Sequence, residues 1–423
     1  MSLAIFALTL FLVIKRPYGI GIGYSALLGA GITLALGITT FRDVEIVWGI
    51  VWNATFTLVA IIIASLIFDE AGFFEYLAVK FVRFSKGSGR RLFVFIILLG
   101  ALISAFFAND GTALVLTPIV YSILVRIGAK KEGILPFIMA TGFIADAASM
   151  PFVVSNLVNI VTASYFSISF LEYSIVMLIP DLVAILSSIA FLWIFYRKSI
   201  ITEYDHEVTF SREEIRDPLV FRIAAPFIII LVTVYALGGA IGIPVALISV
   251  PAVAILTIIS IMSRKIDVKS AIMNAPWQIV LFSLGMYIIV FGMGREGVTV
   301  VLANVVSHLQ NLPGPLSVLS SGLFFALVAA LMNNMPSVMI INLSLSHLSA
   351  SSMMIYTNVI ANDIGPKFTV IGSLATLLWI HSLEKKKVAR VSGLYYTKVG
   401  LAVGLPVLSL TLISLWLTFL IIP

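Results

Sequence analysis

Cysteine is absent from this chain of 423 residues, and charged residues make up only 11% of it. Without cysteine the chain can form neither disulfide bonds nor thiolate metal sites. A soluble globular domain carries about 25% charged residues, whereas here 61% of the residues are hydrophobic and the mean hydropathy is +1.13. The composition therefore excludes a soluble domain and predicts an all-α protein with many spans in the lipid bilayer.

Several constellations that mark enzymes are also missing. The chain has no G-x-S-x-G elbow, no paired G-x-G-D aspartates and no H-E-x-x-H segment. Three of its four histidines, His308, His347 and His381, are isolated and share no ligand spacing, and His206 lies in a mixed-charge segment typical of a solvated linker. We therefore expect no catalytic residue, no cofactor and no metal site. The net charge of +6 comes from short loops between apolar runs, so it indicates membrane topology and not a nucleic-acid partner.

Two distant apolar stretches are interrupted by the same polar residues. AFFANDGTALVLTP (105–118) and ALMNNMPSVMIINL (330–343) align without a gap at a spacing of 225. The pairs matched at this spacing are Asn109 and Asn334, Thr112 and Ser337, Trp52 and Trp277, and Gly72 and Gly297. The chain is therefore built twice. Matched breaks in a duplicated membrane protein are typical of a secondary transporter whose substrate site lies at the breaks.

The basic loops predict how the two copies face the membrane. Residues 92–125 are flanked on both sides by arginine or lysine, so this stretch leaves and re-enters the cytoplasmic face. Its two arms, of roughly 25 and 21 Å, are each shorter than a bilayer core of about 30 Å, which predicts a re-entrant hairpin. The matching stretch 316–348 has no basic residue near either end and is expected to open to the opposite side. This charge asymmetry predicts two inverted repeats.

A second pair of breaks follows the hairpins. GFIADAASMPF (142–152) and NVIANDIGPKF (358–368) match at a spacing of 216, so that Asp146 falls on Asn362. Each places a polar cluster and a proline inside a long apolar run, which predicts two discontinuous helices. In all we predict about ten transmembrane helices plus the two hairpins. The first repeat covers residues 1–196, a cytoplasmic linker covers 197–217, and the second repeat covers 218–423.

The breaks expose half-helix termini whose N–H groups and dipoles can hold a polar solute without burying a full charge. Asn109 or Asp110 can cap the arm that begins at Gly111, and Asn334 can cap the arm with Pro336 in its first turn. The predicted substrate-binding residues are Asn109, Asp110, Gly111, Thr112, Asp146, Ser149, Asn333, Asn334, Ser337, Asn362 and Asp363. For a single hairpin tip taken alone, helix capping would be the better explanation, but four related breaks favour a functional site.

Carboxylates inside the membrane are the candidates for proton coupling. An unpartnered carboxylate costs at least about 2.5 kcal/mol to insert, so Asp110, Asp146 and Asp363 are candidate functional groups. Lys367 is the expected partner of Asp363, and we predict that it supplies a fixed positive charge where a sodium-coupled carrier binds a cation. A purely structural ion pair is the alternative. For Asp181 two interpretations remain: a buried polar group whose hydrogen bonds are satisfied, or a residue on the proton path.

The chain closely resembles the bacterial arsenite and antimonite efflux carriers, the arsenical pump membrane proteins of the ion transporter superfamily. The resemblance covers nearly the whole length. The motifs that carry it include IVWNATFTLVAIIIASLIFDEAGFFE, FANDGTALVLTPIV, GFIADAASMPFVVSNLVNIV, MNNMPSV and GPKFTVIGSLATLLW. Some relatives carry cysteine where this chain has Asn362 and Asp363, so arsenic–thiolate bonding is impossible here.

The resemblance implies export of trivalent arsenic and antimony as uncharged hydroxides in exchange for protons. It also implies a scaffold and a transport domain, location in the bacterial inner membrane, and optional coupling to a soluble arsenite-stimulated ATPase. A small neutral trihydroxide needs hydrogen-bond donors and acceptors, which the predicted site offers. The alternative is a sodium- or proton-coupled carrier of another small anion, or of sodium, within the same superfamily.

Overall fold

The computed structural model describes residues 1–204, 215–273, 275–348, 350–385 and 391–421. Its described part is all-helical, at 83% helix, as the composition predicts. Eight of the described helices are long and apolar enough to cross a membrane. Within the predicted linker, residues 205–214 lie outside the described residues, and His206 is among them.

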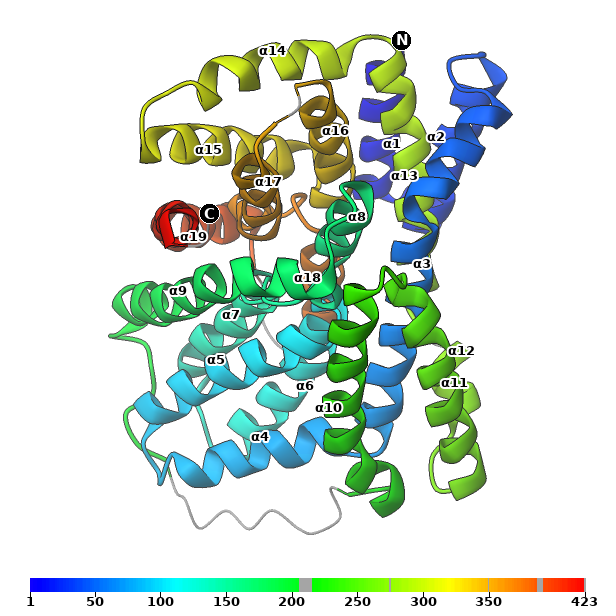
Figure 1. The fold of residues 1–423 in the computed structure, drawn as a ribbon. Coiled ribbons are helices and arrows are strands. Elements are labelled where there is room, and N and C mark those ends of the chain that lie inside the picture. The colour runs from blue at the N-terminus through cyan, green and yellow to red at the C-terminus, as the bar shows by residue number, and fades with distance from the viewer. Residues whose placement is uncertain (205–214, 274, 349, 386–390, 422–423) are drawn as a thin grey trace.

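The helices of the first half lead from the N-terminus to the linker. They are α1 (Ser2–Lys15), α2 (Ile22–Ala35), α3 (Phe41–Glu70), α4 (Phe73–Phe84), α5 (Gly89–Phe106), α6 (Asn109–Arg126), α7 (Lys131–Ala147), α8 (Leu157–Tyr165) and α9 (Phe170–Tyr196), with the short 3-10 turns η1 (Pro17–Gly19) and η2 (Val153–Ser155). Figure 1 shows them in blue to green.

The helices of the second half repeat this order. They are α10 (Pro218–Ala240), α11 (Val245–Ser263), α12 (Val268–Met273), α13 (Trp277–Arg295), α14 (Val298–Gln310), α15 (Pro315–Met332), α16 (Asn334–His347), α17 (Ser352–Ile364), α18 (Leu374–Lys385) and α19 (Gly393–Ile421), with the 3-10 turn η4 (Gly365–Phe368). Helices α12 and α13 together match the single helix α3, and every other helix has one counterpart. The order of the described helices thus agrees with the duplication seen at a few positions in the sequence.

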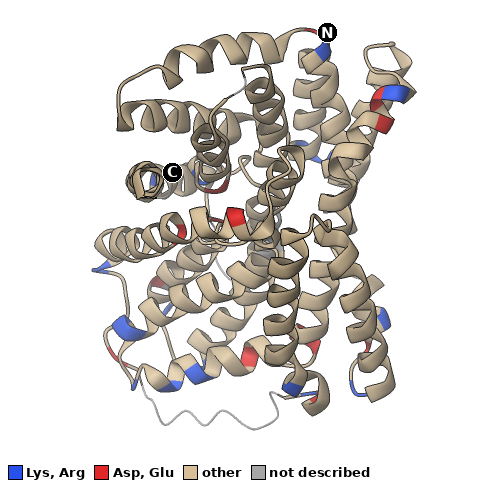
Figure 2. Cartoon of the chain, viewed as in Figure 1, with Lys and Arg blue, Asp and Glu red and all other residues tan. Residues whose placement is uncertain are grey.

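The helices gather into two groups (Figure 1). Helices α1, α2, α3 and α10–α13 lie on the right of the view, and α5, α7, α9, α15, α17 and α19 lie on the left. The second group includes α5 and α15, the first arms of the two hairpins. Figure 2 shows many of the Lys and Arg residues along the lower and left margins, and few charged residues inside the fold. The separation into two groups of helices agrees with the expected scaffold and transport domains.

The two repeats exchange contacts instead of folding as separate halves. In α3, Asn53 Oδ1 accepts a hydrogen bond of 2.8 Å from the Ala246 backbone N–H, at the second residue of α11. Its counterpart Gln278 in α13 accepts one of 2.9 Å at Oε1 from the Gly23 backbone N–H, at the second residue of α2. Each side chain satisfies one of the free N–H groups at a helix start. Each repeat therefore caps a scaffold helix of the other.

One backbone feature is repeated with almost the same geometry. Gly72 and Gly297 precede α4 and α14 with φ angles of 85° and 88°. A residue with a Cβ is strained in this left-handed region, so glycine lets the chain turn sharply between successive helices. The matched glycines found in the sequence are thus explained by the same turn in both repeats.

Replacing Gly297 with Ala is expected to lower the free energy of unfolding by about 1 kcal/mol. A Cβ at this position would meet no atom within 4 Å, so the cost comes from the backbone alone. The measurement is a denaturant titration in detergent. Gly31→Ala is the matched control, because Gly31 also faces open space but lies inside α2, where alanine stabilises by about 0.5–1 kcal/mol. Equal stability of the Gly297→Ala variant and the wild type would contradict this explanation.

Candidate functional site

Both predicted hairpins are present, and each turns at a polar break. The first turns between α5 and α6 and the second between α15 and α16. The residues predicted to cap α6 and α16 are wrong, because each N-cap lies at least one residue earlier in the chain. Ala108, not Asn109 or Asp110, occupies the N-cap of α6. Asn333, not Asn334, caps α16, where its Oδ1 accepts a hydrogen bond of 3.3 Å from the Met335 backbone N–H. Asn109 and Asn334 begin their helices, which leaves both side chains free for other contacts.

The two discontinuous helices are also present. After α7 ends at Ala147, the chain continues through η2 and resumes as α8. After α17 ends at Ile364, it passes through η4 and resumes as α18. The free ends of these four half-helices bring the polar residues of the two breaks into the interior.

An ion pair joins the two breaks. Lys367 Nζ lies 2.5 Å from Asp146 Oδ2, and the two side chains are 2% and 1% exposed. Lys367 also donates a hydrogen bond of 2.7 Å to the Gly142 carbonyl, and Asn109 Nδ2 donates one of 2.7 Å to Asp146 Oδ1. A buried charge is tolerated only when a partner and further hydrogen bonds compensate its lost hydration. The tip of the first hairpin and both breaks thus meet at Asp146.

The predicted pairing of Lys367 with Asp363 is therefore wrong. These residues are four apart, a spacing that places side chains together only on a continuous helix. Here α17 ends at Ile364 and the chain tightens into η4 at Gly365 and Pro366. The change of helix type turns Lys367 toward the first repeat.

Asp363 has a neutral partner instead. Its Oδ1 accepts a hydrogen bond of 2.6 Å from Asn156 Nδ2, and Asn156 also donates one of 3.1 Å to Ser149 Oγ. The other oxygen, Asp363 Oδ2, is buried and has no hydrogen-bond partner among the described residues. The two breaks therefore exchange contacts reciprocally, since Asp146 of the first binds Lys367 of the second and Asp363 of the second binds Asn156 of the first.

A chain of amides extends the site along the second repeat. Asn362 Nδ2 donates to Asn358 Oδ1 at 2.6 Å, Asn358 Nδ2 donates to Asn342 Oδ1 at 2.9 Å, and Asn342 Nδ2 donates to Thr162 Oγ1 at 3.2 Å. Every member of this chain is fully buried. Such a network fixes the orientation of each amide and leaves selected oxygens open.

Open hydrogen-bonding atoms concentrate in the second repeat. Buried polar atoms with no partner among the described residues include Asn334 Oδ1, Ser337 Oγ, Asn362 Oδ1 and Asp363 Oδ2. Buried polar groups are normally paired, so unpaired ones call for an explanation such as a bound solute. These four atoms can accept hydrogen bonds, and Ser337 can also donate one.

The remaining predicted residues contribute in other ways. Thr112 Oγ1 donates to the Ala108 carbonyl of its own helix at 3.3 Å, and Ser149 Oγ donates to the Asp146 carbonyl at 2.7 Å. Asn333 Nδ2 donates to the Ile371 carbonyl at 3.1 Å, which joins the second hairpin to the second break. Gly111 lies in the first turn of α6 with Ser65 Oγ near the position of a Cβ. The side chain of Asp110 lies outside the described part of the structure.

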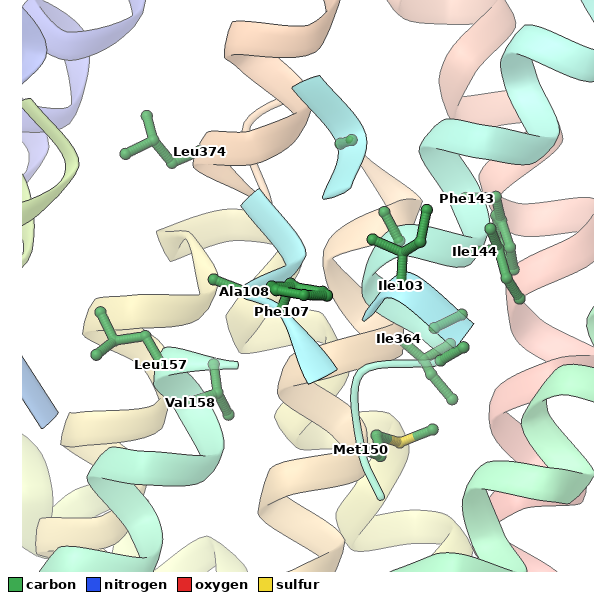
Figure 3. Close-up of a cluster of buried hydrophobic side chains, with 14 of the residues drawn as sticks. Ile103, Phe107, Ala108, Phe143, Ile144, Met150, Leu157, Val158, Ile364 and Leu374 are labelled. Atoms are coloured by element: carbon green, nitrogen blue, oxygen red, sulfur yellow. The ribbon is translucent and has the colours of Figure 1, made fainter. Parts of the chain in front are cut away.

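An apolar shell encloses these polar groups. Figure 3 shows Phe107 and Ala108 at the first hairpin tip, close to Leu157 and Val158 at the start of α8, with Met150 and Ile364 of the two breaks nearby. All of these side chains are at most 4% exposed. A shell of this kind excludes water and strengthens every electrostatic interaction inside it.

Sequence reasoning missed several buried polar residues. Asn156 and Asn159 hold the first break together, since Asn159 Nδ2 donates to the Ser149 carbonyl at 2.7 Å. Asn342 and Asn358 belong to the amide chain described above. Each of them is a polar residue inside an apolar run, and that signal was present in the sequence.

Comparison with known proteins gives the family. The family model described as arsenical pump membrane protein matches residues 1–419. The chain is 44% identical to an arsenical pump membrane protein of Escherichia coli over 417 residues, which is 97% of each chain, and 43% identical to one of Yersinia enterocolitica over the same shares. The fold is similar to that of the YdaH transporter of Alcanivorax borkumensis, with a TM-score of 0.54 at 14% identity over 88% of this chain and 87% of that one.

These relatives are bacterial membrane pump proteins, and the candidate spans agree with a multi-pass protein of the bacterial inner membrane. The matched residues include both hairpins and both breaks. The chain belongs to the arsenical pump membrane protein family.

Proposed function

We propose that this protein is a secondary active carrier that exports trivalent arsenite and antimonite as neutral hydroxides in exchange for protons, by alternating access. Family membership supports arsenicals as the substrate class. The observation that supports a neutral substrate is the ion pair of Asp146 and Lys367. Because Asp146 pairs with Lys367, this lysine offers no free positive charge to an anion. A trihydroxide can donate hydrogen bonds to the open oxygens of Asn334, Ser337 and Asn362.

Asp363 is the carboxyl group best suited to carry the proton. Of the three candidates, Asp146 is compensated by Lys367, and the side chain of Asp110 lies outside the described residues. Asp363 has only a neutral amide as its partner and one open oxygen in a fully buried position. A buried carboxylate without a counter-ion favours its protonated form. Substrate that donates a hydrogen bond to Asp363 favours the ionised form, which couples the two events.

Besides its ion pair with Asp146, we propose a role for Lys367 in place of a coupling ion. Its ammonium group provides the fixed positive charge that a bound sodium ion provides in a sodium-coupled carrier. The close contacts of Lys367 support this role, because Asp146 pairs with its charge and the Gly142 carbonyl accepts a further hydrogen bond from it. The sodium-coupled alternative is disfavoured for the same reason. The soluble ATPase that the resemblance implies is an optional partner and is not needed for proton exchange.

The duplicated architecture supports alternating access. The basic residues along the lower margin of Figure 2 indicate the cytoplasmic side by the positive-inside rule, and the hairpin α5–α6 then opens to that side. A cavity of about 300 Å³ between α3, the α8–α9 connection and the α10–α11 turn reaches Val153 in the first break. Asn53 spans its edge, donating a hydrogen bond of 2.8 Å to Ser164 Oγ. We propose that this cavity is part of a solute route that leads to the first break.

Replacing Asn334 with Ala is expected to raise the KM for arsenite by about tenfold, since one open acceptor is worth about 1–2 kcal/mol. The measurement is uptake of arsenite into everted membrane vesicles. Asn311→Ala is the matched control, because Asn311 is exposed and its side chain donates to the Ser307 carbonyl of its own helix. An unchanged KM would remove Asn334 from the site. Uptake that requires sodium, and that arsenite does not saturate, would contradict the proposed function itself.

A further inference from the structure

Trp379 is a buried aromatic residue of the second repeat that contacts the first repeat. Its side chain, in α18, is 2% exposed, and its Nε1 atom donates a hydrogen bond of 2.9 Å to Thr117 Oγ1 in α6. An indole N–H can only donate, and a buried one usually has an acceptor. Here the acceptor belongs to the second arm of the first hairpin. The contact therefore joins the helix after the second break to the hairpin of the other repeat.

The hydrogen bonding continues from α6 into α7. Thr117 Oγ1 lies 3.1 Å from Thr141 Oγ1, and Thr141 donates a hydrogen bond of 2.8 Å to the Ile138 carbonyl of its own helix. A hydroxyl group has one hydrogen to donate, so Thr117 is the donor to Thr141. The result is a directed chain of hydrogen bonds from Trp379 to Ile138. Both threonines are buried, and this chain connects α18, α6 and α7.

The ring of Trp379 also lies against Gly142, the residue that follows Thr141. A Cβ at Gly142 would lie 2.9 Å from the ring atoms Cε2 and Cζ2 of Trp379, which is closer than a Cβ normally approaches another atom. The Gly142 carbonyl accepts the hydrogen bond of 2.7 Å from Lys367 Nζ, and Nζ lies 2.5 Å from Asp146 Oδ2. The indole ring therefore packs on the residue whose carbonyl helps to hold the ammonium group of the ion pair.

We propose that Trp379 is a positioning residue, which fixes the Gly142 carbonyl and so keeps Lys367 on Asp146 while the site reorients. This inference rests on the proposed alternating access. An uncompensated charge is costly to move through a low-dielectric interior, so the ion pair must stay closed for the site to reorient as a neutral unit. Without the N–H contact to α6, the indole ring holds Gly142 less firmly and Lys367 compensates Asp146 less well.

This role separates the rate of transport from the affinity for the substrate. The open oxygens proposed to bind the substrate lie on α16 and α17, whereas Trp379 donates to α6. Loss of the Trp379 contact is therefore expected to slow reorientation and to lower the maximal rate of uptake, while the KM for arsenite stays the same. The opposite pattern, a raised KM, is expected for Asn334→Ala.

The test is arsenite uptake into everted membrane vesicles under a pH gradient, with each rate divided by the amount of protein that elutes as a single folded species in detergent. Trp379→Phe keeps a ring against Gly142 and removes the N–H, and Thr117→Val removes the acceptor. Each is expected to lower the maximal rate by about fivefold to tenfold, with the KM within about twofold of the wild type. The double variant is expected to match the slower single variant within about twofold, because both changes remove the same hydrogen bond.

Two matched controls accompany these variants. Thr117→Ser keeps the hydroxyl group and is expected to keep the maximal rate within about twofold of the wild type. Trp416→Phe removes the same N–H from a half-buried tryptophan near the C-terminal end of α19, and its rate is also expected to be unchanged.

The outcomes separate this inference from the proposed function. If the wild type takes up arsenite only with sodium, or not at all, the proposed function fails and this inference fails with it. If the wild type transports and both Trp379→Phe and Thr117→Val keep its maximal rate, only the positioning role is overturned. A raised KM at an unchanged maximal rate also overturns it, because Trp379 would then serve substrate binding. Equal losses in Thr117→Ser and Thr117→Val would assign the effect to packing and overturn it too.

Discussion

Replacing Lys367 with Met is expected to leave Asp146 buried without its counter-ion and to cost about 3–5 kcal/mol in the free energy of unfolding. Methionine matches the apolar stem of lysine, so the loss reports the missing charge and not a cavity. Among the described residues, Asn109 Nδ2 would still donate to the Asp146 carboxylate, but a neutral amide does not compensate a full charge in a dry site. Arsenite transport is expected to fall by at least about 100-fold.

A second variant separates the charge from the side chain. In the double variant Asp146→Asn with Lys367→Met the uncompensated charge is gone, so the free energy of unfolding is expected to return to within about 1.5 kcal/mol of the wild type. Denaturant titrations of the two single variants and the double variant give the coupling energy. Lys398→Met is the matched control, because Lys398 lies exposed on α19. A Lys367→Met protein with wild-type stability and transport would show that the ion pair is dispensable.

Replacing Asp363 with Asn is expected to abolish proton coupling while the site stays assembled. Asparagine can accept the hydrogen bond from Asn156 through its own Oδ1, so the contact between the two breaks survives. An amide cannot take up or release the proton, so arsenite uptake driven by a pH gradient is expected to fall by about 100-fold or more. Arsenite counterflow, which needs no proton, is expected to continue.

The control for this variant is Asp267→Asn. Asp267 is exposed at the start of α12 and accepts a hydrogen bond of 3.0 Å from the Ser270 backbone N–H, a role that asparagine fills equally well. Its uptake is expected to equal that of the wild type. If Asp363→Asn keeps full coupling, the proton is carried by another carboxyl group. If it loses counterflow as well, the Asp363 carboxylate is required for transport itself and its main role is not proton exchange.

The breaks and hairpins were predictable because each leaves a local signal. A polar residue, a proline or a glycine inside an apolar run interrupts the helix there, as at Asn109, Asn333 and Pro366. Helix caps were less accurate, since adjacent residues such as Asn333 and Asn334 are chemically identical. Only the backbone conformation, with φ of 80° at Asn333, decides between them.

The contacts between repeats were not predictable from one sequence. Lys367 and Asp363 are neighbours in the chain, so local spacing favoured their pairing over the true partner Asp146 in the other repeat. The reciprocal caps by Asn53 and Gln278 have the same origin, because their partners Ala246 and Gly23 lie in the opposite half. The duplication shows which residues of the two repeats correspond. It does not show that a residue of one repeat contacts a partner in the other. Packing of the two repeats decides that.

The central claim is that this protein alone exchanges arsenite for protons. The measurement is the internal pH of proteoliposomes that contain only this protein and a pH-sensitive dye, after an arsenite gradient is imposed. The expected result is a pH change that requires arsenite, needs neither sodium nor ATP, and disappears in the Asp363→Asn variant. Arsenite that crosses the membrane with no pH change would contradict it and would indicate uniport or obligate coupling to an ATPase.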